Sequence, residues 1–492
     1  MGEVRKQPRM KVLVRLDIID AALSTSSRPN RTPSDNAMRS LAQVAADLAR
    51  GGKSRGLIEG CLAQIADQSG EGRRAFLKVY AEDALAAADF YDRVRAGGAA
   101  PSLFAGIPVS IKDLFNVAGD VTTAGSVALK NGKATTRDAP AVARLRAAGL
   151  IPIGRTNMTE FAFSGLGINP HYGTPLNAYD RAAGRIPGGS SSGAAVSITD
   201  GMAFGALGSD TGGSCRIPAA LCGIVGFKPT ADRVPTAGAF PLSTSLDSIG
   251  PLAATVACCA ALDAVLAGEP AVDLAPFPLT GLRLALPQTM VLENVEPEVA
   301  RAFESALAML RKAGTRIADI PLRELAELRQ INAKGGLAAP EAYALHRSLI
   351  AKAEKMYDPR VLVRILRGQE QDAADYIELL NARADFIRRV AAVTAPYDAL
   401  VMPTVPVTAP RLADLAADDA YRHANFLVLR NPSIANFLDR CSISIPCHRA
   451  GDAPVGLMLI GEHHADRRLL AIAGAIEAVV APRSVHAESQ RP

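Results

Sequence analysis

Apolar residues recur at helical spacing in several parts of the chain and predict its main helices. Between Leu41 and Leu48 they lie three or four positions apart and two glycines follow, which predicts an amphipathic helix with a glycine stop. A second helix is expected from Pro297, which suits a first turn, to Gly314. Residues 322–395 keep a helical pattern nearly throughout. We therefore predict a long helical segment in that part of the chain.

Short apolar runs alternate with these helices and predict strands. Before the first of these runs the pattern is helical through about Val94. One strand is expected in GIPVSIKDLF at 106–115, with Lys112 near its end. Residues 139–154 read as helix, glycine stop and strand, and repetition of that unit indicates an α/β layered fold. Further strands are expected at 281–287, 399–402, 441–447 and 455–460, and a final helix at 465–480.

The length and composition are consistent with one large domain. A chain of 492 residues allows two or more domains, but a single α/β enzyme with a helical insertion also fits, and we favour it. Apolar residues make up 49% and charged residues 21% of the chain, as in a soluble globular protein with a large core. Residues 1–35 include SSRPNRTPSDN and show no sustained periodicity. We expect a loose extension at 1–35 and the domain at 36–492, with an insertion at about 322–395.

The charge pattern excludes several classes of partner. The net charge of +5 is spread along the chain, and no Lys/Arg run is long enough for a nucleic-acid patch or a membrane-surface helix. No stretch reaches the roughly 18 apolar residues of a spanning helix. The N-terminus has acids where the apolar region of a signal peptide would lie. We expect a cytoplasmic protein with no nucleic-acid or membrane partner, and a homodimer stays open.

The cysteines and histidines do not form a metal-binding pattern. The seven cysteines include no CxxC pair, and an odd number cannot all pair within one chain. The only adjacent histidines, His463 and His464, fit the start of a surface helix better than a metal site. We predict reduced thiols, no metal and no cofactor.

The segment from Ile186 to Thr230 carries the clearest chemical signal. It contains two glycine-serine turns, separated by small and apolar residues, with an Asp, an Arg and a Pro around them. Small residues let backbone N–H groups and serine hydroxyls converge on a reacting atom. Lys112, a lone lysine upstream, can supply the base that such hydroxyls need.

This segment resembles the signature of the amidase signature family, serine hydrolases that cleave carbon-nitrogen bonds of amides. The matching motifs are GGSSSG at 188–193, GSDTGGSCRIPAA at 208–220, GFKPT at 226–230 and GIPVSIKDLF at 106–115. Similar blocks extend the resemblance from about Met38 to the last helix. It implies an α/β/α sandwich around a large mixed β-sheet, with the helical insertion over the active site.

The resemblance also implies the roles of individual residues. Ser214 is expected to be the nucleophile, Ser190 the bridging serine and Lys112 the base, and the peptide bond between Gly189 and Ser190 is expected to be cis. The enzyme would cleave small-molecule amides through an acyl-enzyme intermediate, and esters, carbamates or ureido compounds are open as substrates. Turns rich in glycine can direct several N–H groups at one point, so the oxyanion donors are expected among Thr211, Gly212 and Gly213.

A lysine base requires a particular environment. Free lysine has a pKa of about 10.4, so burial must lower it toward roughly 7–8 before the amine can accept a proton at neutral pH. Asp113 follows Lys112, but adjacent side chains of a strand point to opposite faces, so the two need not pair. Asp210 and Arg216 are expected to support the nucleophile turn rather than to contact substrate.

The substrate pocket is less readable from the sequence. The resemblance places it between the loop after the base, the helical insertion and a strand-loop around Asn436 and Phe437, without a readable charge code. Ser191 is a further candidate, for a hydrogen bond near the reacting groups. The lining candidates are Met158, Phe161, Phe163, Phe240, Tyr343, His346 and Phe437.

Three alternatives stay open at this point. GSSSG also matches the nucleophile elbow of α/β-hydrolases, with Ser191 as nucleophile, but a loop rather than a strand precedes it. Cys215 or Cys222 as nucleophile would lack an adjacent base. The third is the glutaminase component of a glutamyl-tRNA amidotransferase complex, which uses the same triad. ADRVPTAGAFPLSTSLDSIGPL after GFKPT looks more like a stand-alone hydrolase, and CSISIPC at 441–447 departs from that component.

Overall fold

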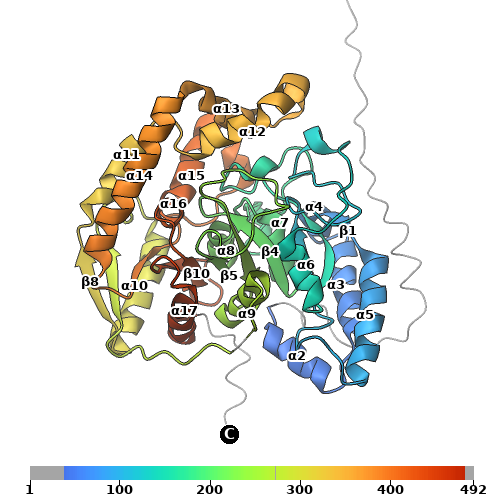
Figure 1. The fold of residues 1–492 in the computed structure, drawn as a ribbon. Helices are drawn as coiled ribbons and strands as arrows, with labels where there is room; N and C mark the ends of the chain where they lie inside the picture. Colours follow the sequence, from blue (N-terminus) through green and yellow to red (C-terminus); the bar gives the residue numbers. More distant parts are fainter. Residues whose placement is uncertain (1–37, 272, 482–492) are drawn as a thin grey trace, which may run out of the picture.

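The structure, a computed structural model, describes residues 38–271 and 273–481 (Figure 1). The extension expected at 1–35 lies outside the described residues. These residues form an α/β fold around one mixed 11-stranded sheet, in the order β1-β3-β2-β4-β6-β5-β10-β11-β9-β7-β8. The strands are β1 (Phe76–Val79), β2 (Pro108–Lys112), β3 (Ile151–Thr156), β4 (Gly205–Asp210), β5 (Val225–Lys228), β6 (Ser248–Ala253), β7 (Arg283–Pro287), β8 (Arg316–Ile320), β9 (Ala399–Pro403), β10 (Ser442–Pro446) and β11 (Gly456–Ile460).

Two groups of parallel strands are embedded in this sheet. β2 is parallel to both of its neighbours, β3 and β4. β7 is parallel to β8 and β9, and the remaining pairs are antiparallel. Because β2 and β4 are adjacent and parallel, their carboxyl ends meet at the same edge of the sheet. Lys112 ends β2 and Asp210 ends β4, so residues far apart in the sequence are brought together there.

Helices cover the sheet on both sides, as the α/β/α expectation requires. α7 and α8 pack on the central strands and on each other, whereas α9 and α17 pack together against the same part of the sheet. The helices are α2 (Leu41–Ala49), α3 (Ser54–Ala66), α4 (Gly72–Ala75), α5 (Ala81–Ala96), α6 (Pro140–Ala147), α7 (Ser192–Thr199), α8 (Arg216–Cys222), α9 (Val256–Ala267), α10 (Pro297–Lys312), α11 (Leu328–Ile331), α12 (Ala338–Ala353), α13 (Pro359–Leu366), α14 (Ala373–Thr394), α15 (Asp418–Arg430), α16 (Pro432–Phe437) and α17 (Asp466–Val480).

Local sequence signals account for where several of these elements begin. Ser40 and Gln43 form a capping box at the start of α2, and Asp372 and Asp375 form another at α14. Pro297 occupies the first turn of α10, as its fixed φ favours. The strands β9 and β11 are buried along their whole length, which explains why ALVMP and GLMLI are continuous apolar runs. β4, with the sequence GALGSD, is equally buried but has no such run, and the sequence did not predict it.

Two local expectations are wrong. Residues 76–79 form the strand β1 inside a region expected to be helical through about Val94. β1 has only four residues and pairs with β3 alone, and so short a segment has no readable period. Asn436 and Phe437 lie on α16, not in a strand-loop, because Pro432 begins a helix directly after α15.

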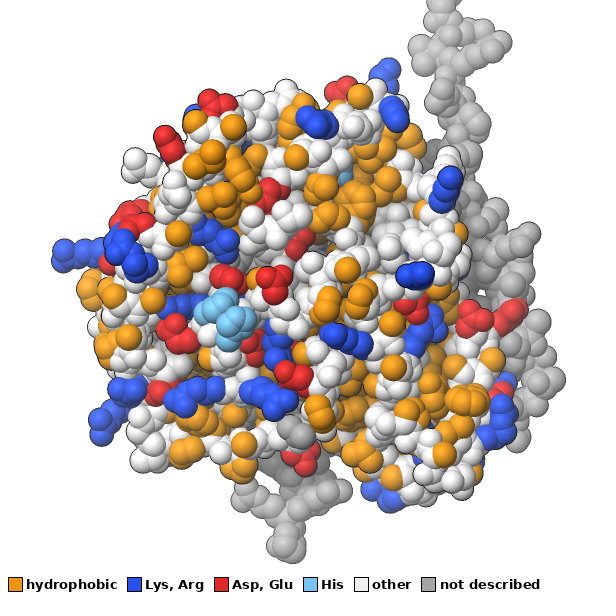
Figure 2. Space-filling view, in the orientation of Figure 1, with side chains coloured by type: hydrophobic (Ala, Val, Ile, Leu, Met, Phe, Trp, Pro, Cys, Tyr) orange, Lys and Arg blue, Asp and Glu red, His pale blue; other side chains and the backbone are white. Residues whose placement is uncertain are grey.

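The segment expected as a helical insertion contains α11 to α14, drawn in yellow to orange at the upper left of Figure 1. None of the helices within residues 38–271 and 273–481 has the length and apolar character needed to span a bilayer. On the face drawn in Figure 2, basic and acidic side chains are interspersed. All seven cysteines lie in the described part, where each is buried and none is paired.

Candidate active site

Lys112 lies buried at the carboxyl end of β2 and contacts two serines. Its Nζ donates to Ser190 Oγ and to Ser209 Oγ, each at 2.8 Å. The side chain is fully buried. Ser209 is on the neighbouring strand β4, whereas Ser190 comes from the turn before α7. The strand pairing therefore supplies one partner of the amine and the glycine-serine turn supplies the other.

The surroundings of Lys112 favour an uncharged amine. Burial lowers the pKa of Lys112 to about 8, against the weaker opposing effects of Cys215, Asp210 and Asp247. In the described residues no carboxylate lies within ion-pair distance of Nζ. The adjacent Asp113 instead pairs with Arg155, at 2.6 Å between Arg155 Nε and Asp113 Oδ1. The alternation of strand side chains therefore separates Asp113 from the amine, as the sequence predicts.

The first glycine-serine turn presents Ser190 directly before α7. The peptide bond between Gly189 and Ser190 is cis, in agreement with the resemblance. A Cβ at Gly189 would lie 2.6 Å from the backbone nitrogen of Gly167, so the close approach of two chain segments requires glycine there. The backbone carbonyl of Ser190 accepts a hydrogen bond from Thr159 N at 3.1 Å. Ser190 is thus buried between neighbouring segments.

The second turn joins β4 to α8 and carries Ser214. Ser191 N donates to the carbonyl oxygen of Ser214 at 3.3 Å, which links the two turns. Gly213 has a φ of +127°, and a Cβ there would lie 2.6 Å from Pro432 Cβ. Only glycine suits both that backbone angle and that space. Ser214 is only 3% exposed, and it lines a cavity.

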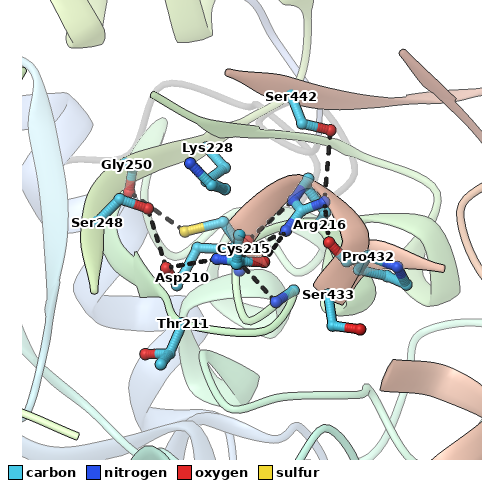
Figure 3. Close-up of polar contacts among 12 residues, drawn as sticks. Asp210, Thr211, Cys215, Arg216, Lys228, Ser248, Gly250, Pro432, Ser433 and Ser442 are labelled. Carbon is cyan, nitrogen blue, oxygen red and sulfur yellow. Dashed lines mark hydrogen bonds and ion pairs between the residues drawn. The ribbon is translucent and has the colours of Figure 1, made fainter. Parts of the chain in front are cut away.

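A buried ion pair supports this turn from beneath (Figure 3). Arg216 Nη2 lies 2.9 Å from Asp210 Oδ1, and neither side chain is exposed. Asp210 also accepts from Gly213 N at 2.8 Å and from Cys215 N at 3.0 Å. Burial alone would raise the pKa of Asp210, but the charge and hydrogen bonds of Arg216 hold it well below its usual range. Both residues hydrogen-bond around the turn, as expected from the sequence.

Asn436, which the sequence analysis named only as part of the substrate pocket, completes this network. Asn436 Nδ2 donates to Asp210 Oδ1 at 2.9 Å, and Arg216 Nη2 donates to Asn436 Oδ1 at 2.7 Å. Figure 3 shows Arg216 also reaching Pro432 and Ser442, with 2.8 Å between Nη1 and the carbonyl of Pro432. α16 is therefore fastened to the nucleophile turn. Its role is invisible in the sequence because more than 200 residues separate the two.

One of the expected oxyanion donors needs correction. Gly213 N already donates to the carboxylate of Asp210, so this N–H is not available to a substrate oxygen in the structure. Thr211 and Gly212 line the cavity beside Ser214. For their N–H groups we find no acceptor in the part of the chain that the structure describes. The glycine pattern alone cannot tell which of the three N–H groups is free, because that depends on the Asp210 carboxylate, which accepts from Gly213 N in the folded turn.

The cavity beside Ser214 has a volume of about 650 Å³ and is lined by residues from the turn between β4 and α8, the helical segment, α15 and α16. Of the expected pocket residues, Phe163 and Phe437 line it. Phe240 lines a smaller neighbouring cavity, together with Ser209 and Asp247.

The remaining pocket candidates are placed elsewhere. Met158 and Phe161 are buried in the main core, and Phe161 packs on Phe240, His346 and Tyr357 with ring centroids 4.4–5.4 Å apart. Tyr343 packs against that same core. Ser191 is buried, with its Oγ 3.5 Å from the carbonyl of Ser209. The positions of aromatic residues in the sequence do not reveal which rings face a cavity.

The chain is similar to known proteins over most of its length. The family model described as Amidase matches residues 57–470. The 2-amino-5-chloromuconic acid deaminase of Comamonas testosteroni is 40% identical over 386 residues, which cover 76% of this chain and 82% of that protein. The GatA-type component of the glutamyl-tRNA(Gln) amidotransferase of Thiobacillus denitrificans is 34% identical over 472 residues, 88% of this chain and 96% of that one.

Solved structures give the same grouping. A crystal structure of an amidase superposes with a TM-score of 0.81 at 29% identity, covering 90% of this chain and all of that one. The peptide amidase of Stenotrophomonas maltophilia superposes with a TM-score of 0.74 at 28% identity, covering 92% and 98%. Together with the geometry around Lys112, these matches over most of its length show that the chain belongs to the amidase family of amide-hydrolysing enzymes.

Proposed function

We propose that this protein hydrolyses the C–N bond of small-molecule amides, with Ser214 as nucleophile, Ser190 as bridging hydroxyl and Lys112 as base. The observation that carries the proposal is the buried amine of Lys112, 2.8 Å from Ser190 Oγ and without a carboxylate partner among the described residues. An amine in that setting with a pKa of about 8 is partly neutral near neutral pH and can accept a proton.

Acylation follows from this arrangement. Neutral Lys112 takes a proton from Ser190 Oγ, which takes one from Ser214 Oγ as that oxygen attacks the amide carbonyl. The tetrahedral oxyanion would accept hydrogen bonds from the N–H groups of Thr211 and Gly212. The C–N bond then breaks, and the proton returns through Ser190 to the departing nitrogen. Ser214 is left as an ester of the acyl group.

Deacylation repeats the same proton path with water. Water attacks the ester carbonyl while its proton passes through Ser190 to Lys112. The ester C–O bond breaks, Ser214 regains its proton and a carboxylic acid leaves. An ester, carbamate or ureido compound can enter the same sequence, because only the leaving group differs.

The test is a panel of amides, esters, carbamates and ureas, with 2-amino-5-chloromuconic acid and glutamine included, on the purified full chain. Ser214→Ala should lower kcat by about 10³-fold or more. Ser305→Ala, on α10 and outside the cavity, should leave it unchanged. Mass spectrometry with a slowly released acyl group should show the adduct on Ser214. Retention of more than a tenth of the activity in Ser214→Ala would contradict the nucleophile assignment.

A second candidate function is glutaminase within an amidotransferase complex. It is favoured by the 34% identity to the Thiobacillus denitrificans protein over nearly its whole length. The higher identity to the Comamonas testosteroni deaminase, 40%, favours the stand-alone enzyme. Turnover of simple amides by the chain alone would support our proposal, whereas glutaminase activity that appears only with added partner proteins would support the complex.

A further inference from the structure

The cavity beside Ser214 is lined by basic side chains without any acidic one. Its charged lining residues are Arg329, Arg364, Arg367 and Arg430, and no Asp or Glu of the described residues is among them. A second cavity, of about 830 Å³, shares Arg364, Arg367 and Arg430 with it. These three arginines, on and just after α13 and at the end of α15, are named the arginine cluster below.

Arg430 differs from the other buried arginines. Four arginines of the described residues are buried, and three of them pair with a carboxylate: Arg155 with Asp113, Arg216 with Asp210 and Arg440 with Glu462. Arg430 donates instead to the carbonyls of Val291 and Glu293 and to Asn431 Oδ1, one bond from each nitrogen. Because the protein occupies all three of its nitrogens, Arg430 contributes positive charge to the cavity wall rather than a free donor.

Arg364 is the half-buried member of the arginine cluster and makes a single hydrogen bond within the described residues. Its Nη1 donates to the carbonyl of Phe163, and the guanidinium lies 5.5 Å from the Phe163 ring centroid. No other acceptor for it, and no ion pair, is found in the described residues. Burial lowers the pKa of Arg364 and the charge of Arg367 lowers it further, against the opposing effects of Tyr421 and Asp358. Asp358 lines the second cavity, but neither Arg364 nor Arg367 forms an ion pair in the described residues, and two adjacent guanidinium groups without ion pairs form a site of positive potential.

Hydrogen bonds to backbone carbonyls do not account for all the donors of Arg364. Arg383 on α14 shows what a purely structural arginine looks like here, since all three of its nitrogens donate to carbonyls, those of Phe437, Ser245 and Asn436. Arg383 does not line the cavity. Arg364 lines the cavity, and within the described residues only one of its three nitrogens donates to the protein.

We infer that the arginine cluster binds a carboxylate of the substrate, which makes the preferred substrate an amide that carries a second, ionised acid group, such as the monoamide of a dicarboxylic acid. This inference rests on the proposed function for the reaction, but the binding site itself does not depend on it. Guanidinium groups bind carboxylates through charge-assisted and bidentate hydrogen bonds. The acid group would hold the other end of the molecule while its amide faces Ser214.

The kinetic test compares amides that differ only in the acid group. Succinamate, glutaramate and adipamate are compared with butyramide, pentanamide and hexanamide by ammonia release from the purified full chain. At least one acid should exceed its neutral counterpart by about 10- to 100-fold in kcat/KM, mainly through KM. Arg364→Met, which keeps the length of the stem, should reduce that ratio about tenfold or more. Arg364→Lys should retain part of it, and Arg388→Met, at an exposed position on α14 outside both cavities, should leave it unchanged.

A binding measurement separates this inference from the proposed reaction. Calorimetry with succinate, glutarate and adipate on the Ser214→Ala enzyme should show binding that weakens with added salt and is lost in the Ser214→Ala, Arg364→Met double variant. Equal kcat/KM for every acid and its neutral counterpart would overturn the inference while leaving the amidase proposal intact. Dicarboxylate binding that Arg364→Met and Arg364→Lys leave unchanged would also overturn it. Failure of Ser214→Ala to lose activity would overturn only the catalytic assignment.

Discussion

At the scale of single residues, the environment of an amine decides whether it can act as a base. Lys112 and Lys228 are both buried lysines on neighbouring parts of the sheet, and burial lowers the pKa of both. Lys112 contacts two serine hydroxyls, whereas the contact of Lys228 is the carbonyl of Pro229, at 2.6 Å. Only Lys112 has a hydroxyl from which it can draw a proton. The same chemical group is therefore proposed as a base at one position and not at the other.

The pH profile should follow the protonation of Lys112. Because only the neutral amine accepts a proton, kcat/KM for an uncharged amide should rise about tenfold per pH unit below pH 8 and level off above it. Stopped assays between pH 6 and 9.5 measure this rise in kcat/KM and the level part above it. Lys112→Met should remove it together with nearly all turnover. A rate that falls between pH 6 and pH 8 would contradict a neutral lysine as base.

The ion pair beneath the nucleophile turn should be essential for stability. Asp210→Asn leaves Arg216 charged and fully buried without a counter-ion, which should lower the free energy of unfolding by about 3–5 kcal/mol. Denaturant unfolding followed by circular dichroism measures the loss. Asp385→Asn provides the control, because the side chains of its partners Arg388 and Arg389 both reach solvent and such pairs contribute about 0–1 kcal/mol. Equal effects of the two substitutions would show that the buried pair has no special role.

At the level of elements, β4, the turn after it and α8 together position Ser214, the proposed nucleophile. β4 ends at Asp210 and α8 begins at Arg216, and these two residues pair across the turn between them. Pro432 of α16 packs against the turn at Gly213. The turn is therefore held by a strand, a helix and a distant helix at once.

Gly213→Ala should disturb this turn more than a glycine substitution elsewhere. The added Cβ would combine a φ of +127° with atoms of Pro432 and Ile217 at 2.6–2.9 Å, so we expect a loss of about 2–4 kcal/mol and of most activity. Gly184→Ala is the matched control, with a φ of +68° and no atom within 4 Å. It should lose only about 1 kcal/mol. Thermal unfolding and kcat are measured for both, and a similar loss in the two variants would exclude crowding at Gly213.

At the scale of the whole molecule, the helical segment contributes one wall of the cavity beside Ser214. Leu328, Leu337 and Arg364 line that cavity from this segment. Arg383 on α14 ties the segment to α16 and to the loop at Ser245 through its three carbonyl contacts. The sheet carries the proposed reacting groups, and the helical segment contributes to the space in which a substrate would lie.

Arg383→Leu should loosen this wall without unfolding the sheet. We expect KM to rise about three- to tenfold, because three hydrogen bonds worth roughly 0.5–1.5 kcal/mol each are lost at the wall. Hydrogen exchange should increase in α14 and α16 but not in β2 or β4. Arg388→Leu, exposed on the same helix, serves as the control. Faster exchange in the central strands would mean that Arg383 supports the whole fold instead.

Sequence patterns alone predict the fold class, the positions of most helices and strands, and the motifs that carry Lys112, Ser190 and Ser214. These features are local, because they follow from periodicity, from caps such as Ser40 and from glycines that a turn requires. Only the tertiary structure decided that Ser209 is a partner of Lys112 and that Asn436 joins the ion pair of Asp210. It also decided that the N–H of Gly213 is occupied and that the arginine cluster faces the cavity. The contact of Gly213 spans only three residues, but its geometry is set by the folded turn. The others depend on contacts between segments up to 226 residues apart, and a chain pattern with a period of two to four residues contains no information at that distance.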